Sequence, residues 1–437
     1  MNQTAAPFET AARVRPRSDR PARVMAAALA VMVLSGQAWL VAGRHFATIL
    51  ETPFLPYCLI GAFAIHFWTR PGRTERAVTL ALAGASTGAF VLWSGRYRFD
   101  WPSSIACGSF LGLASLAVLA CQTVRLRGPA QKEKLETLAA GSVFGYSALF
   151  IAFILDLTTR LHPQTYDWYL YAADAGFGIP VCAWIGELVG SRPLLLHACS
   201  LVYESLPLAV SLLYAYQRSG AKRLPVQVLP AFIGGGAAAY ALYNVLPATG
   251  PRYIFGAAFP DRMPAVPAAL HVVHVGDVAR NAVPSMHLAC ALMILWACRP
   301  LSPWVRAAAA AFQGLTILAT IGYGEHYLVD LIAGVPYALA LEAICAGRDF
   351  PARRRAAALG AMLAVGWIVV LRFGTPLFTS GVFTWMASGL TLAACAAAQR
   401  AFARGDSPEP GSAAVPGKEW RPQGDSNPRY RRERAMS

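Results

Sequence analysis

The amino-acid sequence predicts an all-α protein, a polytopic bundle of about twelve transmembrane helices. Hydrophobic residues make up 56% of the 437 residues, charged residues only 14%, and the mean hydropathy is +0.43. A soluble domain carries about 25% charged residues. Apolar runs of about twenty residues, long enough to cross a bilayer core about 30 Å thick, recur along nearly the whole chain. This composition excludes a soluble globular protein and a domain held by a single anchor.

The positive charge of the chain has a membrane explanation. The net charge of +15 would suit a nucleic-acid-binding protein, but the basic residues lie in short loops between apolar runs, where they set membrane orientation. We therefore expect no nucleic-acid partner. The nine cysteines are scattered, mostly within apolar runs, which predicts neither a disulfide framework nor a metal cluster.

The predicted spans follow one another along most of the chain. A basic segment at 1–23 precedes the first span, 24–43, which is longer than the apolar region of a signal peptide and is expected to be retained. The other predicted spans are 53–68, 77–94, 103–123, 135–156, 193–217, 226–246, 285–299, 304–323, 326–346, 356–372 and 378–397. Residues 400–437, rich in Pro, Gly, Arg and Glu, are predicted to form a disordered cytoplasmic tail.

Basic residues in alternate loops predict the orientation. If the N-terminus is cytoplasmic, the loops on its side should be basic. These loops contain Arg70, Arg73 and Arg76, then Arg125, Arg127, Lys132 and Lys134, then Arg218, Lys222 and Arg223, then Arg299 and Arg306, and last Arg348 and Arg353 to Arg355. The loops near 44–52, 95–102 and 373–377 are less basic. Both termini are therefore predicted to be cytoplasmic. The Arg- and Ala-rich composition favours a bacterial inner membrane, and a eukaryotic endomembrane is the alternative location.

Two outer segments, 157–192 and 247–284, are too long to be simple turns. The first contains Tyr166, Trp168, Tyr169, Tyr171 and Trp184. Aromatic residues at this density favour the interface between lipid headgroups and tails. The segment is predicted to be either an anchoring belt or a platform for lipid entry.

Three polar stretches begin or end predicted spans. The first stretch is 247–253, the second stretch is 283–287, and the third stretch is 324–330. The predicted topology places all three at the same outer face, so we expect them to converge.

In the third stretch, His326 and Asp330 are four residues apart and would share one face of a helix. The carboxylate would accept a hydrogen bond from one ring nitrogen and leave the other as a nucleophile or base. An ionisable pair at membrane depth indicates function by default. The alternative is a structural hydrogen bond between neighbouring helices.

The other two stretches supply groups that suit an anion. Ser285 is a good helix cap, and a helix N-terminus binds anions. His287 follows in the first turn and would protonate a leaving oxygen. Arg252 lies in a loop stiffened by Pro247 and Pro251 and offers a planar fork that matches phosphate. Taken singly these are a cap and a headgroup-facing arginine, but together they suit phosphoryl transfer, which needs charge stabilisation and positioning.

Pro284-Ser285-Met286-His287, followed by His326-Tyr327-Leu328-Val329-Asp330, resembles the type 2 phosphatidic acid phosphatase superfamily. The pattern is similar to the branch that includes inositol phosphorylceramide synthase, an inositolphosphotransferase, and bacterial membrane phosphatases. Residues 247–252 resemble the first motif of that branch. The resemblance covers about 136–346, which would be a six-span core, with accessory spans in 24–135 and 347–399.

The resemblance implies a role for each residue. His326 would attack phosphorus and form a phosphohistidine, oriented by Asp330, and His287 would protonate the leaving group. Ser285 and Arg252 would hold phosphate oxygens. No metal or other cofactor is expected. The substrate would be a membrane lipid phosphate, pyrophosphate or phosphodiester, with an alcohol acceptor in a transferase.

One position departs from the family pattern. Many members have an arginine six residues before the nucleophilic histidine, where this chain has Thr320. Arg262 and Arg280 are the candidates to supply that charge. The missing arginine leans toward a transferase, but hydrolysis and transfer both remain open.

Two other classes of protein fit the composition. A transporter or flippase built from repeats should show related halves, and the chain has no second copy of either histidine stretch. A metal-dependent enzyme could use His287, His326 and Asp330 as ligands. That reading leaves the helix cap and Arg252 without a role.

Overall fold

The computed structural model describes residues 52–94, 97–98, 100–220, 224–347, 350 and 352–404, with isolated positions between 27 and 34. The predicted basic segment 1–23 and the part of the predicted tail from 405 to 437 lie outside the described residues. Apart from those isolated positions, so does the predicted first span, 24–43.

The described chain is helical, which confirms the predicted all-α class. Its longer helices are α3 (Leu55–Trp68), α4 (Arg73–Ser94), α5 (Trp101–Arg125), α6 (Gly128–Gly145), α7 (Ser147–Leu161), α10 (Pro193–Arg218), α11 (Val228–Val245), α13 (Met286–Ala297), α14 (Pro303–Gly322), α15 (Leu328–Ile344), α16 (Arg353–Phe373) and α17 (Gly381–Arg404). The shorter ones are α8 (Asp167–Ala175), α9 (Val181–Gly190), α12 (Pro251–Phe255), η1 (Gly256–Ala258) and η2 (Thr375–Thr379). Strands β1 (Gln164–Thr165) and β2 (Val273–His274) form one antiparallel pair.

Seven of the described helices are long and apolar enough to cross a membrane, and they make this an integral membrane protein. They are α4, α5, α10, α11, α14, α16 and α17. Helices α6 and α7, bent by 47° at their junction, would add an eighth span if they cross as one. Helices α3 and α13 are apolar but have only 14 and 12 residues. The count of twelve spans therefore stays a prediction.

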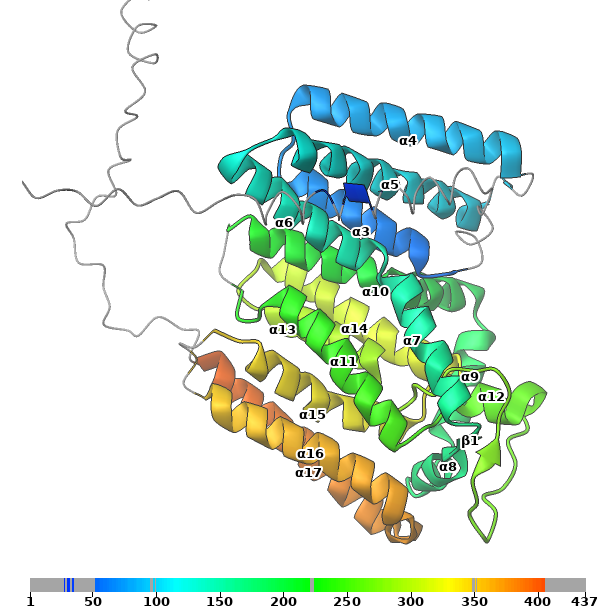
Figure 1. The fold of residues 1–437 in the computed structure, drawn as a ribbon. Helices are drawn as coiled ribbons and strands as arrows, with labels where there is room; N and C mark the ends of the chain where they lie inside the picture. Colours follow the sequence, from blue (N-terminus) through cyan, green and yellow to red (C-terminus); the bar gives the residue numbers. More distant parts are fainter. Residues whose placement is uncertain are drawn as a thin grey trace, which may run out of the picture.

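The long helices lie alongside one another in successive groups (Figure 1). Helices α3 to α6 form one edge of the bundle, α10, α11, α13 and α14 occupy the middle, and α15 to α17 form the opposite edge. The short helices α8, α9 and α12 and the β1–β2 pair gather at one end of the bundle. That end holds the three polar stretches.

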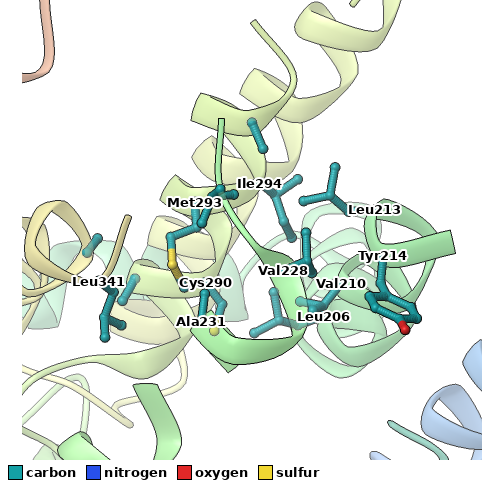
Figure 2. Packing of buried hydrophobic residues seen from close by; sticks show 14 of the residues in the cluster. Leu206, Val210, Leu213, Tyr214, Val228, Ala231, Cys290, Met293, Ile294 and Leu341 are labelled. Carbon is teal, nitrogen blue, oxygen red and sulfur yellow. The ribbon is translucent and has the colours of Figure 1, made fainter. Parts of the chain in front are cut away.

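The middle group closes around a cluster of buried apolar side chains, drawn in Figure 2. The residues labelled in Figure 2 come from four helices: Leu206, Val210, Leu213 and Tyr214 from α10, Val228 and Ala231 from α11, Cys290, Met293 and Ile294 from α13, and Leu341 from α15. Because lipid tails are as apolar as these side chains, close packing rather than water exclusion holds such helices together. The cluster fixes α13 and α15, which carry residues of the second and third stretches.

Helices α3 and α5 approach closely at Gly112. A Cβ atom at this position would lie 2.0 Å from the Leu59 carbonyl oxygen of α3. Small residues allow such approach between membrane helices. Gly112 therefore sets the spacing of the two helices.

Replacing Gly112 with alanine should push α5 away from α3. We expect the free energy of unfolding to fall by about 1–3 kcal/mol, as is typical of overpacking, and the midpoint of thermal unfolding in detergent to fall with it. Gly84→Ala is the matched control, because Gly84 lies on α4 and a Cβ atom there meets no atom within 4 Å. Equal midpoints for the two variants would contradict the close approach.

Candidate active site

The three polar stretches meet at one end of the bundle, as the sequence predicts. The main-chain N–H of Arg252 donates to the Gly324 carbonyl oxygen at 3.1 Å, which joins the first stretch to the third. The N–H of Ala282, just before the second stretch, donates to the Ala248 carbonyl oxygen at 3.0 Å. These bonds bring together segments that are far apart in the sequence.

Gly250 lets the first stretch lie against the third. Its φ of +126° is unfavourable for any residue with a side chain. A Cβ atom there would also lie 2.5 Å from the Glu325 carbonyl oxygen. No other residue fits this position without moving one of the two loops.

His326 lies in the loop between α14 and α15, because α15 begins only at Leu328. The prediction that His326 and Asp330 share a helix face is therefore wrong. The His326 Nδ1 atom lies 2.8 Å from the Ala282 carbonyl oxygen and 3.5 Å from Asp330 Oδ2. The Asp330 carboxylate instead accepts the Tyr327 main-chain N–H at 2.8 Å and caps α15.

This contact fixes the tautomer of His326. A carbonyl oxygen only accepts hydrogen bonds, so Nδ1 carries the proton and Nε2 keeps its lone pair. The side chain is only 3% exposed. Burial lowers the pKa of His326 to about 4, although the nearby Glu325 carboxylate acts in the opposite direction. The ring is therefore neutral near pH 7, and Nε2 is available as a nucleophile or base.

The second stretch forms a helix start with a histidine in its first turn. Ser285 is the N-cap of α13, and its Oγ accepts the Leu288 N–H at 3.4 Å, which confirms the predicted cap. The His287 ring stacks on the Tyr203 ring of α10, with centroids 4.0 Å apart and planes 10° apart. Burial lowers the pKa of His287, and so does the charge of His326.

Arg252 is paired with a carboxylate that our sequence analysis did not single out. Its guanidinium donates to Glu325 at 3.0 Å, and the Tyr253 hydroxyl donates to both oxygens of the same carboxylate at 2.9 and 3.0 Å. The Arg252 side chain is 51% exposed. The only sequence signal for Glu325 is its position directly before His326.

The two candidate auxiliary arginines do not supply the missing charge in this geometry. Arg280 is 1% exposed, and its guanidinium donates to main-chain carbonyl oxygens. These acceptors are His162 and Val275 at 2.9 Å, Gly276 at 3.1 Å, and Val278. Arg262 is exposed, and its side chain makes no hydrogen bond or ion pair to the described residues of the site. Thr320 is buried and donates to the Thr316 carbonyl oxygen of its own helix.

Asp167, at the start of α8, ties the first stretch to the third. Its buried carboxylate accepts the Gly250 N–H at 2.8 Å and the Thr249 N–H at 3.1 Å. It also accepts the Tyr327 hydroxyl at 3.2 Å. One carboxylate thus fixes the turn before Arg252 and the residue after His326.

Asp174, one residue before the end of α8, caps α15. Its carboxylate accepts the N–H groups of Leu328 and Val329, each at 2.9 Å, and the Cys182 thiol at 3.1 Å. Burial raises the pKa of the Asp174 carboxyl to about 7, against the opposing effect of the two amides. With Asp330 on Tyr327, carboxylates accept all three successive N–H groups that follow His326.

Neither aspartate of α8 was predicted from the sequence. The aromatic residues of segment 157–192 predicted an anchoring belt or a lipid-entry platform. Two aspartates seven residues apart, on one face of a helix, were the available signal. Trp168 and Tyr171 pack on Phe255 of α12, with ring centroids 5.4 and 4.8 Å apart, so part of the aromatic set packs within the protein.

Among the described residues, no three His, Cys, Asp or Glu side chains are arranged to hold a metal ion. His287, His326 and Asp330, which we considered as a possible ligand set, do not form one.

A family model described as the PAP2 superfamily matches residues 168–344. The match covers less than half of the chain, but it runs from α8 to the end of α15 and includes all three polar stretches. It supports the predicted superfamily for this part of the chain and, at that coarse level, a phosphatase-like membrane protein. The branch that includes inositol phosphorylceramide synthase stays a prediction. Neither a curated protein nor a solved structure matches the chain.

Replacing Asp167 with alanine should destabilise the protein strongly. The variant leaves the N–H groups of Thr249 and Gly250 and the Tyr327 hydroxyl buried without an acceptor, and each costs about 1–3 kcal/mol. We expect a marked fall in the thermal unfolding midpoint in detergent. Asp156→Ala is the matched control, because Asp156 pairs with Arg160 at an exposed site. Its loss should lower the free energy of unfolding by less than about 1 kcal/mol. An Asp167→Ala variant as stable as this control would contradict the role of Asp167.

Proposed function

We propose that the protein is an integral membrane lipid phosphatase or phosphotransferase that acts through a phosphohistidine at His326. The observation that carries the proposal is the hydrogen bond from His326 Nδ1 to the Ala282 carbonyl oxygen at 2.8 Å. It leaves Nε2 unprotonated and holds the ring at Ala282, the residue directly before the second stretch with its helix start and His287. Phosphoryl transfer needs this kind of positioned nucleophile and local charge stabilisation.

In the first step, His326 Nε2 forms a bond to phosphorus as the bond from phosphorus to the leaving oxygen breaks. His287, protonated at this stage, gives its proton to the leaving oxygen. The positive charge that develops on the His326 ring is stabilised by the Ala282 carbonyl oxygen and by the Asp330 carboxylate 3.5 Å from Nδ1. In the second step, water or an alcohol attacks phosphorus, His287 takes its proton, and His326 leaves.

The phosphate oxygens have two donors in this arrangement. Among the described residues, the Ser285 hydroxyl makes one hydrogen bond, in which it accepts the Leu288 N–H. Its own proton can therefore bond a phosphate oxygen at the positive end of α13. To bind the phosphate, the Arg252 guanidinium must first release the Glu325 carboxylate. Because this ion pair is half-exposed and worth about 0–1 kcal/mol, a charged phosphate can compete for it.

We place the site at the outer face of a bacterial inner membrane. The basic residues that end α5 and α10 and begin α16 support this orientation, because they lie at the end of the bundle opposite α8 and α12 (Figure 1). The substrate class is a lipid phosphate, pyrophosphate or phosphodiester. An alcohol acceptor would make the enzyme a transferase, a reading favoured by the uncharged Thr320.

Phosphate release from phosphatidic acid or an isoprenyl pyrophosphate, measured in detergent without added metal, tests the proposal. The wild-type protein should release phosphate, and His326→Ala should lose about a thousand-fold or more in turnover, as expected for a covalent nucleophile. His287→Ala should lose about 10²- to 10⁴-fold, as expected for a general acid. His197→Ala is the matched control, because His197 is exposed on α10 and should keep full activity.

If the wild-type protein releases no phosphate, labelled phospholipid with alcohol acceptors tests transfer. Products that vanish in His326→Ala support the transferase form of the proposal. No product in either assay, or unchanged activity in His326→Ala, would contradict it.

A further inference from the structure

Three aromatic rings from three helical segments meet beside the second stretch. The His287 ring of α13 lies flat on the Tyr203 ring of α10, with centroids 4.0 Å apart. Phe54, directly before α3, lies 5.7 Å from both rings. Phe54 therefore reaches the site from the accessory helices, outside the segment that matches the superfamily.

The position of Phe54 is fixed by the packing of α3. A Cβ atom at Gly61 of α3 would lie 2.3 Å from the Ser211 Oγ of α10, so the two helices are in close contact. At its other side α3 touches α5 at Gly112. Held between these neighbours, α3 delivers Phe54 to a defined place at its N-terminal end.

Stacking acts on His287 in two ways. A flat contact at 4.0 Å restricts rotation of the imidazole ring, so the nitrogen that carries the proton keeps one direction. The negative face of a tyrosine ring also attracts a cation, and this opposes the effects of burial and of the His326 charge, which lower the pKa of His287. Other charged or titratable groups near this place are His326, Glu325, Arg252, Tyr243, Tyr253 and Tyr323. Both effects are those that a general acid needs.

We propose that Tyr203 and Phe54 are positioning residues for His287, and that α3 thereby completes the active site instead of only packing beside it. The inference rests on the proposed function, in which His287 protonates the leaving oxygen. It gives the accessory helices, for which the sequence offers no motif, a part in the chemistry.

The test compares two leaving groups. Phosphatidic acid releases an alkoxide, which needs protonation, whereas p-nitrophenyl phosphate releases a stable phenolate, which needs little. Tyr203→Leu should reduce turnover of phosphatidic acid by about ten-fold or more, and that of p-nitrophenyl phosphate by about two-fold at most. Tyr203→Phe keeps the stacked ring and should restore both rates. Phe54→Ala should show the pattern of Tyr203→Leu, to a smaller extent.

Two features keep the test decisive. The ratio of the two rates in one preparation does not depend on the fraction of protein that is folded. Tyr216→Leu is the matched control, because Tyr216 packs on Trp68 farther along α10 and should leave the ratio unchanged. Equal losses on both substrates, or no loss in Tyr203→Leu, would overturn the inference. A wild-type protein inactive on both substrates, or insensitive to His326→Ala, would instead overturn the proposed function and the inference with it.

Discussion

The geometry of the site depends on the capture of main-chain N–H groups by the two aspartates of α8. Asp167 accepts the N–H groups of Thr249 and Gly250, and Asp174 accepts those of Leu328 and Val329. Buried amides without an acceptor are costly. The loops before Arg252 and after His326 are therefore held in place by carboxylates from a third segment, which contacts both.

Because of this constraint, the acidic residues of the site have different roles. Asp330 is used to cap α15, so a main-chain carbonyl, that of Ala282, orients the His326 ring. Glu325 is used to hold Arg252 at the half-exposed side of the site. Carboxylates that serve structure thus surround a neutral histidine. In the proposed mechanism, the positive charge that forms on that histidine is stabilised by groups already in place, without reorganisation.

The sequence predicted the helical class, most of the long spans and the meeting of the three stretches, because apolar runs and turn residues are local signals. It did not predict contacts that depend on folding at long range. His326 was expected on a helix, but the helix begins two residues later because Asp330 and Asp174 cap it there. Arg280 was one of two candidates to supply a charge to the site, yet only the folded loop shows the carbonyl oxygens around it. Asp167 and Asp174 lie in a segment that stands out in the sequence only for its aromatic residues. The groups that donate hydrogen bonds to the two carboxylates lie about 80 to 160 residues away in the sequence.

The most direct measurement is to trap the phosphorylated intermediate. Purified protein would be mixed with phosphatidic acid labelled in its phosphate, quenched in base within the first turnovers, digested and sequenced by mass spectrometry. If His326 is the nucleophile, an acid-labile, base-stable phosphoryl group should lie on the peptide that contains His326 and should be absent from His326→Ala. Turnover without any labelled protein, or label on a different residue, would contradict this role of His326.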